Sequence, residues 1–182
     1  MNYKIKANGG WIVPNNSAIT AGTLIPDYSE LGDCCKLGDG CKLGDFCTLG
    51  DFCTLGGYCK LGGYCKLGNG CKLGDICTLG NGCTLGGGCK LGNYCTLGNG
   101  CTLGGGCKLG NYCIWLDVRV ESWLTLANVD GSGRQVKLVK HSSGIKIEAG
   151  CFIGTLEEFT TKAESEGKLR YVAVIKAIEE VL

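Results

Sequence analysis

The chain has 182 residues, and its 18 Lys and Arg residues almost balance its 17 Asp and Glu residues. This balance argues against nucleic acid or an anionic membrane as a partner, and no apolar run approaches the about 20 residues of a membrane span. Gly and Cys are far above average, at 33 and 16 residues, but Gly does not occur at every third position, which excludes collagen.

Residues 1–30 carry scattered apolar side chains and both prolines, Pro14 and Pro26. The first ten residues lack the apolar core of a secretory signal, so we expect a cytoplasmic protein whose cysteines are mostly reduced thiols. Terminal units of repeat proteins are atypical. We therefore predict that residues 1–30 form an N-terminal cap on a repeat domain.

A six-residue repeat begins at Gly32 and continues to Trp115 without an insertion. The first position of each unit is Gly, the second is Asp, Asn or Gly, and the third is variable. The fourth is Cys, the fifth is Lys or Thr, and the sixth is Leu, except in the last unit, which ends in Ile114 and Trp115. The 14 units cover 84 residues, and an 18-residue block at 80–97 recurs at 98–115. Each unit supplies one short strand, in which Cys and Leu share a face and Lys or Thr points the other way.

Three units would make one turn of a three-sided coil, with each strand about 4.8 Å from its equivalent 18 residues earlier. Asp, Asn and Gly tolerate positive φ, so we expect the sharp corner at the second position of the unit. Leu and Cys should fill the interior. The three expected cysteine columns are Cys35, Cys53, Cys71, Cys89 and Cys107; Cys41, Cys59, Cys77, Cys95 and Cys113; and Cys47, Cys65, Cys83 and Cys101.

The pattern Leu-Gly-x-x-Cys-x over residues 31–115 resembles the hexapeptide repeat of left-handed parallel β-helix proteins. This resemblance implies an all-β solenoid with a left-handed parallel β-helix and three hexapeptides, or 18 residues, per coil. It also implies a homo-oligomer, with a homotrimer favoured.

Many proteins of that family are acyltransferases, with a catalytic His on a coil and with loops that interrupt the repeat. Here the only histidine, His141, lies outside the repeat, and no loop interrupts the 14 units. Without a general base beside a cleft, acyl transfer lacks its proton acceptor. We therefore expect no catalytic residue, no cofactor and no enzymatic activity.

After Trp115 Gly becomes sparse, and residues 116–182 are expected to form a small α+β module. Strand patterns are visible at 122–130, 135–140 and 145–148, with turns at 131–133 and 142–144. Thr155 and Glu158 form a capping box that opens a helix, and helical spacing continues over 169–181. The module would cap, oligomerise or bind. Residues 149–159 resemble a C-terminal module of uncharacterised bacteriophage and prophage proteins, which implies a phage-encoded origin.

The thiol columns suggest a thiolate metal rack, a redox column or core filling. Core filling is favoured, because the inward slot needs a small residue and close Cys-x-x-Cys metal pairs do not occur. We therefore predict no metal site. The first candidate ligands for any metal site would be the thiols of Cys34, which should point outward, Cys35 and Cys151.

The variable third position carries aromatic residues that either stack to shield the corner or contact a partner chain or flat ligand. Tyr58, Ile76, Tyr94 and Tyr112 should stack at one corner. The candidate binding surface comprises Phe46, Phe52, Tyr58, Tyr64, Tyr94, Tyr112, Trp115 and Trp123.

The sequence favours a non-enzymatic, phage- or prophage-like scaffold that binds or sequesters a host protein or a small ligand, as an inhibitor of host defence would. The alternatives are a segment of a phage fibre or virion, an ice-binding protein and a hexapeptide acyltransferase. Ice binding would need flat Thr arrays, whereas each face here mixes Thr with Lys. Lys beside aromatics is typical of single-strand nucleic-acid grooves, but the repeat has only 7 Lys against 5 Asp.

Overall fold

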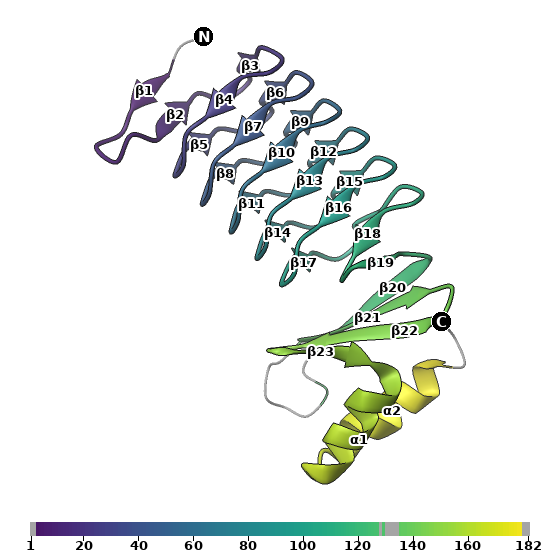
Figure 1. Ribbon diagram of the computed structural model, residues 1–182. Helices are drawn as coiled ribbons and strands as arrows, with labels where there is room; N and C mark the ends of the chain where they lie inside the picture. Colours follow the sequence, from purple (N-terminus) through teal and green to yellow (C-terminus); the bar gives the residue numbers. More distant parts are fainter. Residues whose placement is uncertain (1–2, 128, 130–134, 180–182) are drawn as a thin grey trace. The chain divides into compact units, whose positions relative to one another are not determined.

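The computed structural model describes residues 3–127, 129 and 135–179. The chain divides into two compact units, Met1–Ile114 and Trp115–Leu182. The first is a β-solenoid of about six turns with parallel strands, and the second is a small α+β unit with two helices (Figure 1). The turn expected at 131–133 and the last residues of the second predicted helix lie outside the described residues.

Three sheets form the sides of the solenoid, and from β2 to β17 each receives every third strand of the chain. The first contains β1 (Lys4–Ile5), β2 (Trp11–Val13), β5 (Glu30–Leu31), β8 (Thr48–Leu49), β11 (Lys66–Leu67), β14 (Thr84–Leu85) and β17 (Thr102–Leu103). The second contains β3 (Ala18–Ile19), β6 (Lys36–Leu37), β9 (Thr54–Leu55), β12 (Lys72–Leu73) and β15 (Lys90–Leu91). The third contains β4 (Leu24–Ile25), β7 (Lys42–Leu43), β10 (Lys60–Leu61), β13 (Thr78–Leu79), β16 (Thr96–Leu97) and β18 (Ile114–Trp115).

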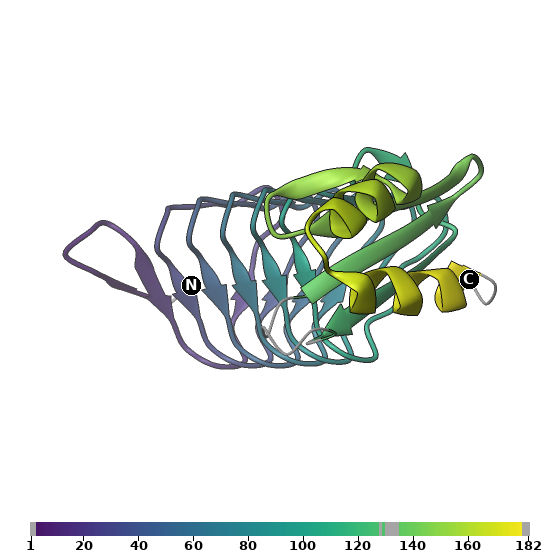
Figure 2. The same cartoon turned by 90° about the horizontal axis from the view of Figure 1, so that it is seen from below.

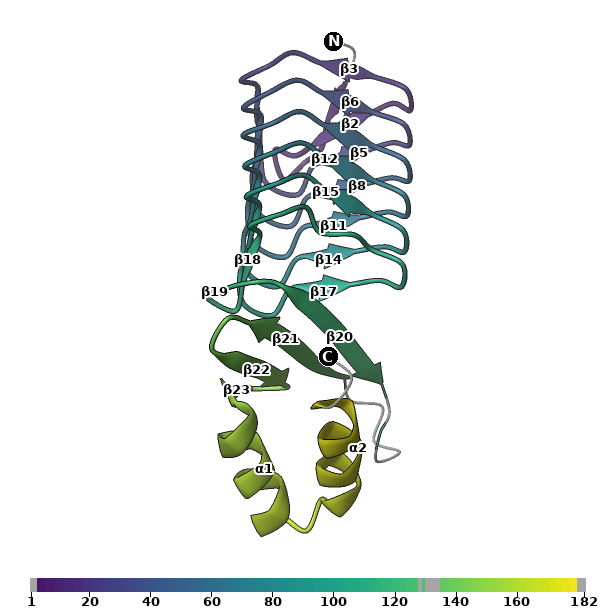
Figure 3. The same cartoon turned by 90° about the vertical axis from the view of Figure 1, so that its right-hand side faces the viewer.

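Neighbouring strands in the coils pair in parallel with residues 18 apart, as Lys66 pairs with Thr48 and Leu67 with Leu49. The same spacing recurs along all three sheets, so the corners of successive coils fall in rows (Figures 2 and 3). In each two-residue strand the Lys or Thr faces solvent and the Leu is buried. The prediction of an 18-residue coil with Leu and Cys inside is confirmed.

The corner residue is not the one that we expected. Positive φ occurs at the third position of the unit, for example 57° at Phe46, 60° at Tyr58 and 61° at Ile76. The prediction that the Asp, Asn or Gly at the second position adopts positive φ is therefore wrong. The Asp or Asn side chain at the second position instead accepts a hydrogen bond from a backbone N–H of the next coil.

Asp and Asn side chains at the second position link successive coils at the corners. Asp33 Oδ1 accepts the backbone N–H of Asp51 at 2.8 Å, and Asp51 Oδ1 accepts that of Asn69 at 2.6 Å. The leading Gly of the unit makes room for this contact. A Cβ on Gly50 would lie 2.1 Å from Asp33 Oδ1 and 2.7 Å from its backbone nitrogen.

The repeat extends further toward the N-terminus than the Gly and Cys pattern predicts. Buried apolar residues continue at spacing six through Val13, Ile19 and Ile25, and β2 pairs in parallel with β5. The inward Cys position is held by Ser17, Thr23 and Ser29, and the leading Gly position by Pro14, Thr20 and Pro26. Among the described residues no coil precedes this one, so no Asp or Asn side chain of an earlier coil contacts the leading position of its units. Gly is therefore unnecessary there.

An antiparallel hairpin precedes the first coil. In it β1 pairs with β2, and the rings of Tyr3 and Trp11 stack at 4.2 Å between centroids. Lys6 Nζ donates to Glu30 Oε1 at 2.8 Å. Residues 11–30 thus form a regular coil, and the atypical part of the N-terminal segment is this hairpin.

The C-terminal unit contains the antiparallel sheet β20 (Ser122–Ala127), β21 (Gln135–His141), β22 (Gly144–Ala149) and β23 (Phe152–Thr155), together with the short strand β19 (Val118–Arg119). Helices α1 (Leu156–Ser165) and α2 (Leu169–Glu179) cover the same face of this sheet (Figures 1 and 3). The sequence predicts the first three strands of the sheet and both helices, but it misses β23.

Three apolar residues of the sheet, Val136, Leu138 and Ile147, form the core of this unit with Phe159 of α1 and Ile175 of α2. The capping box is present, because Thr155 Oγ1 accepts the Glu158 N–H while Glu158 Oε2 accepts the Thr155 N–H. These reciprocal bonds satisfy two backbone donors at the start of α1.

Candidate functional site

Exposed aromatic rings form a ladder along one corner of the solenoid. Tyr28, Phe46 and Tyr64 lie 18 residues apart, and each neighbouring pair of ring centroids is 5.2 Å apart. The rings are nearly parallel, with interplanar angles of 4° and 7°. The sequence interpretation includes Phe46 and Tyr64 but misses Tyr28, whose signal is its spacing of 18 from Phe46.

The other two corners carry shorter stretches of rings. Tyr94 and Tyr112 stack at 4.9 Å between centroids. At the third corner the Phe52 ring lies over Gly70, because a Cβ on that glycine would come within 2.7 Å of two ring carbons. All the predicted corner side chains are 42–64% exposed; they are Phe46, Phe52, Tyr58, Tyr64, Ile76, Tyr94 and Tyr112. Their ring edges and hydroxyls therefore face solvent.

Two tryptophans of the predicted surface lie in the C-terminal unit and differ from these rings. Trp115 is fully buried, so its inclusion in an exposed binding surface is wrong. Its ring meets that of Trp123 edge-on, with centroids 5.5 Å apart, and Lys137 Nζ lies 5.9 Å from its centroid. The cation and the second indole thus occupy the aromatic surface that a partner would need. Trp123 is half-buried.

The cysteine columns line the interior of the coils. All fourteen cysteines in the three columns are buried, and their side chains follow one hydrogen-bonding rule. Each thiol donates to a backbone carbonyl one coil earlier, as Cys53 does to Gly32 O at 3.3 Å and Cys71 to Gly50 O at 3.3 Å. In the first coil the hydroxyls of Ser17 and Ser29 instead donate to carbonyls three residues earlier.

This environment shifts the pKa values of the thiols in both directions. Burial raises the pKa of Cys35 and of Cys41. The neighbouring thiol of Cys101, together with burial, raises the pKa of Cys83 to about 12. In contrast, a hydrogen bond from the next thiol in its column lowers the pKa of Cys53 to about 7. Where the pKa is raised, the thiol is the expected form at neutral pH, and a thiol is a poor nucleophile and metal ligand.

The thiols that we considered for metal binding differ in exposure and in the unit to which they belong. Cys34 and Cys151 are exposed and belong to different units, whereas Cys35 is fully buried. Within residues 3–127, 129 and 135–179, no three His, Cys, Asp or Glu side chains are grouped so that they could hold a metal ion. The described columns behave as a packed core of small apolar side chains.

The outward positions of the strands mix hydroxyls and ammonium groups on every side. In the second sheet Lys72 pairs with Lys90 and also with Thr54. In the first sheet Lys66 separates Thr48 from Thr84. Strongly hydrated ammonium groups therefore share each side with the threonines, and among the described residues no side presents the uniform array on which an ice-binding surface depends.

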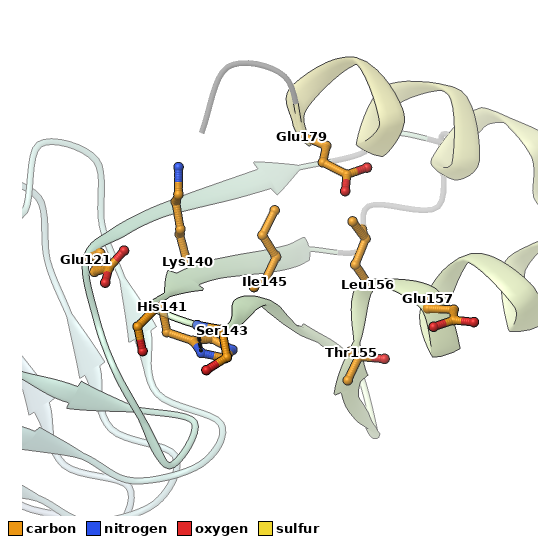
Figure 4. A pocket seen from close by; sticks show the side chains of 11 residues that line it. Glu121, Lys140, His141, Ser143, Ile145, Thr155, Leu156, Glu157 and Glu179 are labelled. Carbon is orange, nitrogen blue, oxygen red and sulfur yellow. Dashed lines mark hydrogen bonds between the residues drawn. The ribbon is translucent and has the colours of Figure 1, made fainter.

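The only histidine lines an open pocket of about 660 Å³ in the C-terminal unit (Figure 4). The pocket lies between the β21–β22 turn, the start of α1 and the end of α2. Its charged lining residues are Glu121, Lys140, Glu157 and Glu179. His141 Nδ1 accepts the backbone N–H of Ser143 at 3.3 Å. In a neutral imidazole this leaves the proton on Nε2, so the ring offers solvent a donor rather than a base.

Comparison with known proteins identifies the repeat. The family described as Bacterial transferase hexapeptide (six repeats) matches residues 70–105. Neither curated proteins nor solved structures give a significant match. In the described part of the chain, neither helix has the length and apolar character to cross a membrane. The family match and the three parallel sheets with their 18-residue register together identify the first unit of this chain as a hexapeptide-repeat β-helix.

Proposed function

We propose that the protein is a non-enzymatic scaffold whose β-helix presents aromatic rings to a binding partner. The ladder of Tyr28, Phe46 and Tyr64 carries this proposal. Its three large apolar side chains are 45%, 46% and 58% exposed, in a continuous row on a rigid support. Exposed aromatic clusters of this kind mark interaction sites more often than isolated exposed side chains do.

The regularity of the coils supports a role in binding rather than catalysis. The repeat contains no histidine and no inserted loop, and its interior consists of buried Leu and Cys. The residue that varies most from unit to unit is the corner residue, which is aromatic or Gly except at Cys34 and Ile76. Variation confined to exposed positions of a constant support is what a binding surface requires.

The proposed assembly is a parallel homotrimer, since flat solenoid faces suit lateral association and hexapeptide-repeat proteins often form trimers. In this proposal the C-terminal unit caps, oligomerises or binds. The ligand or host protein, the phage origin and the cytoplasmic location remain predictions from the sequence. A segment of a phage fibre is the structural alternative.

Native mass spectrometry of freshly purified protein tests this proposal. We expect three chains of 19.1 kDa each with a retained ligand or host protein. A double variant, Phe46→Gly with Tyr64→Gly, should keep the fold, because Gly82 and Gly100 occupy the same corner in later coils. It should lose the partner, whereas Phe52→Gly at another corner should retain it. A monomer without any bound molecule would overturn the proposal, and a ligand-free trimer that copurifies with virion proteins would support the fibre instead.

Acyl transfer is a second candidate function, and the transferase family match favours it. The base would have to be His141, which lies outside the coils and whose Nδ1 already accepts a hydrogen bond. A general base must be free to take a proton from the substrate. We expect no turnover of acyl-CoA by the wild-type protein. Turnover that disappears in a His141→Asn variant would establish the enzyme and displace the scaffold.

A further inference from the structure

The C-terminal unit contains a second, smaller cavity of about 220 Å³ between its sheet and its two helices. Buried apolar groups of Val136, Phe159 and Ala163 line it, and Phe152 contributes a further ring. Phe152 and Phe159 meet edge-on with centroids 5.4 Å apart. A dry apolar cavity of about 150 Å³ is enough to bind benzene, so this one accommodates a benzene-sized ring with a small substituent.

Tyr171 of α2 also lines this cavity and carries one buried polar group. The residue is 3% exposed, its ring meets that of Phe159 edge-on at 6.1 Å, and it lines the cavity. Its hydroxyl is buried, and no hydrogen-bond partner for it occurs among the described residues. A buried donor without an acceptor is unfavourable, and a ligand that brings an acceptor relieves that cost.

The more exposed lining residues carry an excess of positive charge. Lys162 Nζ lies 3.2 Å from Glu166 Oε1, and Lys168 pairs with the other oxygen of the same carboxylate. Hydrogen bonds from Lys168 and Lys162 lower the pKa of Glu166, so the carboxylate is ionised at neutral pH. Two ammonium groups for one carboxylate leave a net positive charge beside the cavity, which favours an anion.

We propose that this cavity binds a small apolar carboxylate of about the size of benzoate. The apolar body packs against Phe152 and Phe159, an acceptor on the ligand takes the Tyr171 hydroxyl proton in a hydrogen bond, and the negative charge lies near Lys162 and Lys168. This site is independent of the ring ladder on the β-helix. The scaffold proposal and this one can therefore fail separately.

Binding of three matched probes, benzoate, benzamide and toluene, to the full chain by calorimetry and ligand-detected NMR tests the proposal. Benzoate should bind more tightly than benzamide, and benzamide more tightly than toluene. Tyr171→Phe should weaken benzoate and benzamide about tenfold and leave toluene unchanged. The same variant should raise the melting temperature of the free protein, because it removes the buried unpartnered hydroxyl.

Two further controls locate the ligand. Lys162→Gln should weaken benzoate but not benzamide, whereas Lys176→Gln should change neither, because Lys176 pairs with Glu164 away from the cavity. Bound benzoate should slow maleimide labelling of Cys151, which lines the cavity, but not of Cys34 in the β-helix. No binding at millimolar benzoate, or benzoate binding that Tyr171→Phe leaves unchanged, would overturn the proposal.

Discussion

At the scale of single residues, the corners of the β-helix combine two unusual requirements. One residue must adopt positive φ, and the residue two positions earlier must lack a Cβ. Most corners meet the first requirement with a ring or with Gly, but Ile76 meets it with a β-branched side chain at φ 61°. Positive φ in such a residue is strained, because its Cβ crowds the following carbonyl.

Replacing Ile76 should therefore stabilise the protein. Ile76→Asn is expected to raise the free energy of unfolding by about 1 kcal/mol, because Asn tolerates positive φ, as Asn16 does at 60° in the first coil. Ile114 is exposed to a similar degree but lies in strand β18. Ile114→Asn should instead destabilise. Urea unfolding of both variants checks the prediction, and a loss of stability in Ile76→Asn would contradict it.

Replacing a glycine at the first position of a unit should instead destabilise the protein. A Cβ on Gly50 would lie 2.7 Å from the backbone nitrogen of Asp33, which is not free to move. Gly50→Ala should cost about 1–3 kcal/mol of folding free energy. Gly105→Ala is the matched control, because nothing lies within 4 Å of its Cβ position and its φ is not positive. Thermal unfolding should separate the two variants, and equal melting temperatures would contradict the account of the corner.

At the scale of elements, two-residue strands gain their stability from stacking. Each coil adds parallel pairing on three sides, a thiol–carbonyl bond for each inward Cys and an Asx bond at many corners. The helices of the C-terminal unit rely instead on an apolar face and on capping. The reciprocal bonds of Thr155 and Glu158 mark the start of α1.

Thr155→Ala should remove one half of this capping box and cost about 1 kcal/mol. Thr161→Ala, in the exposed face of the same helix, should have little effect. Hydrogen exchange in the first turn of α1 measures the difference directly. Unchanged protection in Thr155→Ala would show that the cap does not hold this end of the helix.

The elements differ in how far the sequence predicts them. The repeat specifies the 18-residue coil, the inward Leu and Cys and the outward Lys and Thr. It does so because the alternation of side chains along each strand places the same residue types inward and outward in every six-residue unit. It does not reveal the first coil, because Ser17 and Ser29 replace Cys where Pro replaces Gly. It also places the sharp corner one residue early, because Asp and Asn are common both at positive φ and as hydrogen-bond acceptors.

The candidate site, too, is predicted from the sequence only where it depends on the repeat spacing. Spacing alone predicts which rings share a corner, and Tyr28 is missed only because it precedes the recognised repeat. The burial of Trp115 involves tertiary contacts with Trp123 and Lys137. The cavity beside Tyr171 depends on the packing of β21, β22 and β23 against the helices. No pattern within one element contains that information. The residue types at the cavity, mainly Val, Phe and Ala, are also those of any small core.

At the scale of the whole molecule, the buried thiols whose pKa is raised make stability depend on pH. The native pKa values of Cys35 and Cys41 lie above those in the unfolded chain, so alkali removes protons from the unfolded state first. Their contribution is complete below about pH 8.5 and is lost as the pH rises toward their native pKa values. Each such thiol should then cost about 1.4 kcal/mol per pH unit.

Urea unfolding under reducing conditions between about pH 8 and pH 10 checks this expectation, since Tyr and Lys ionise mainly above that range. The free energy of unfolding should fall with increasing steepness. A Cys41→Ser variant, with one buried thiol fewer, should show a shallower fall. A free energy that stays constant over this range would mean that the thiols are not held protonated by the fold.

The β-helix depends on coils whose sulfur atoms are buried in the interior. Counting the thiols that react with a small reagent under native, reducing-agent-free conditions tests it most directly. Of the 16 cysteines, only Cys34 and Cys151 are exposed. We therefore predict two rapidly reacting thiols in the folded protein and sixteen after denaturation. Rapid reaction of many more thiols in the folded protein would contradict the β-helix with an interior of Leu and Cys.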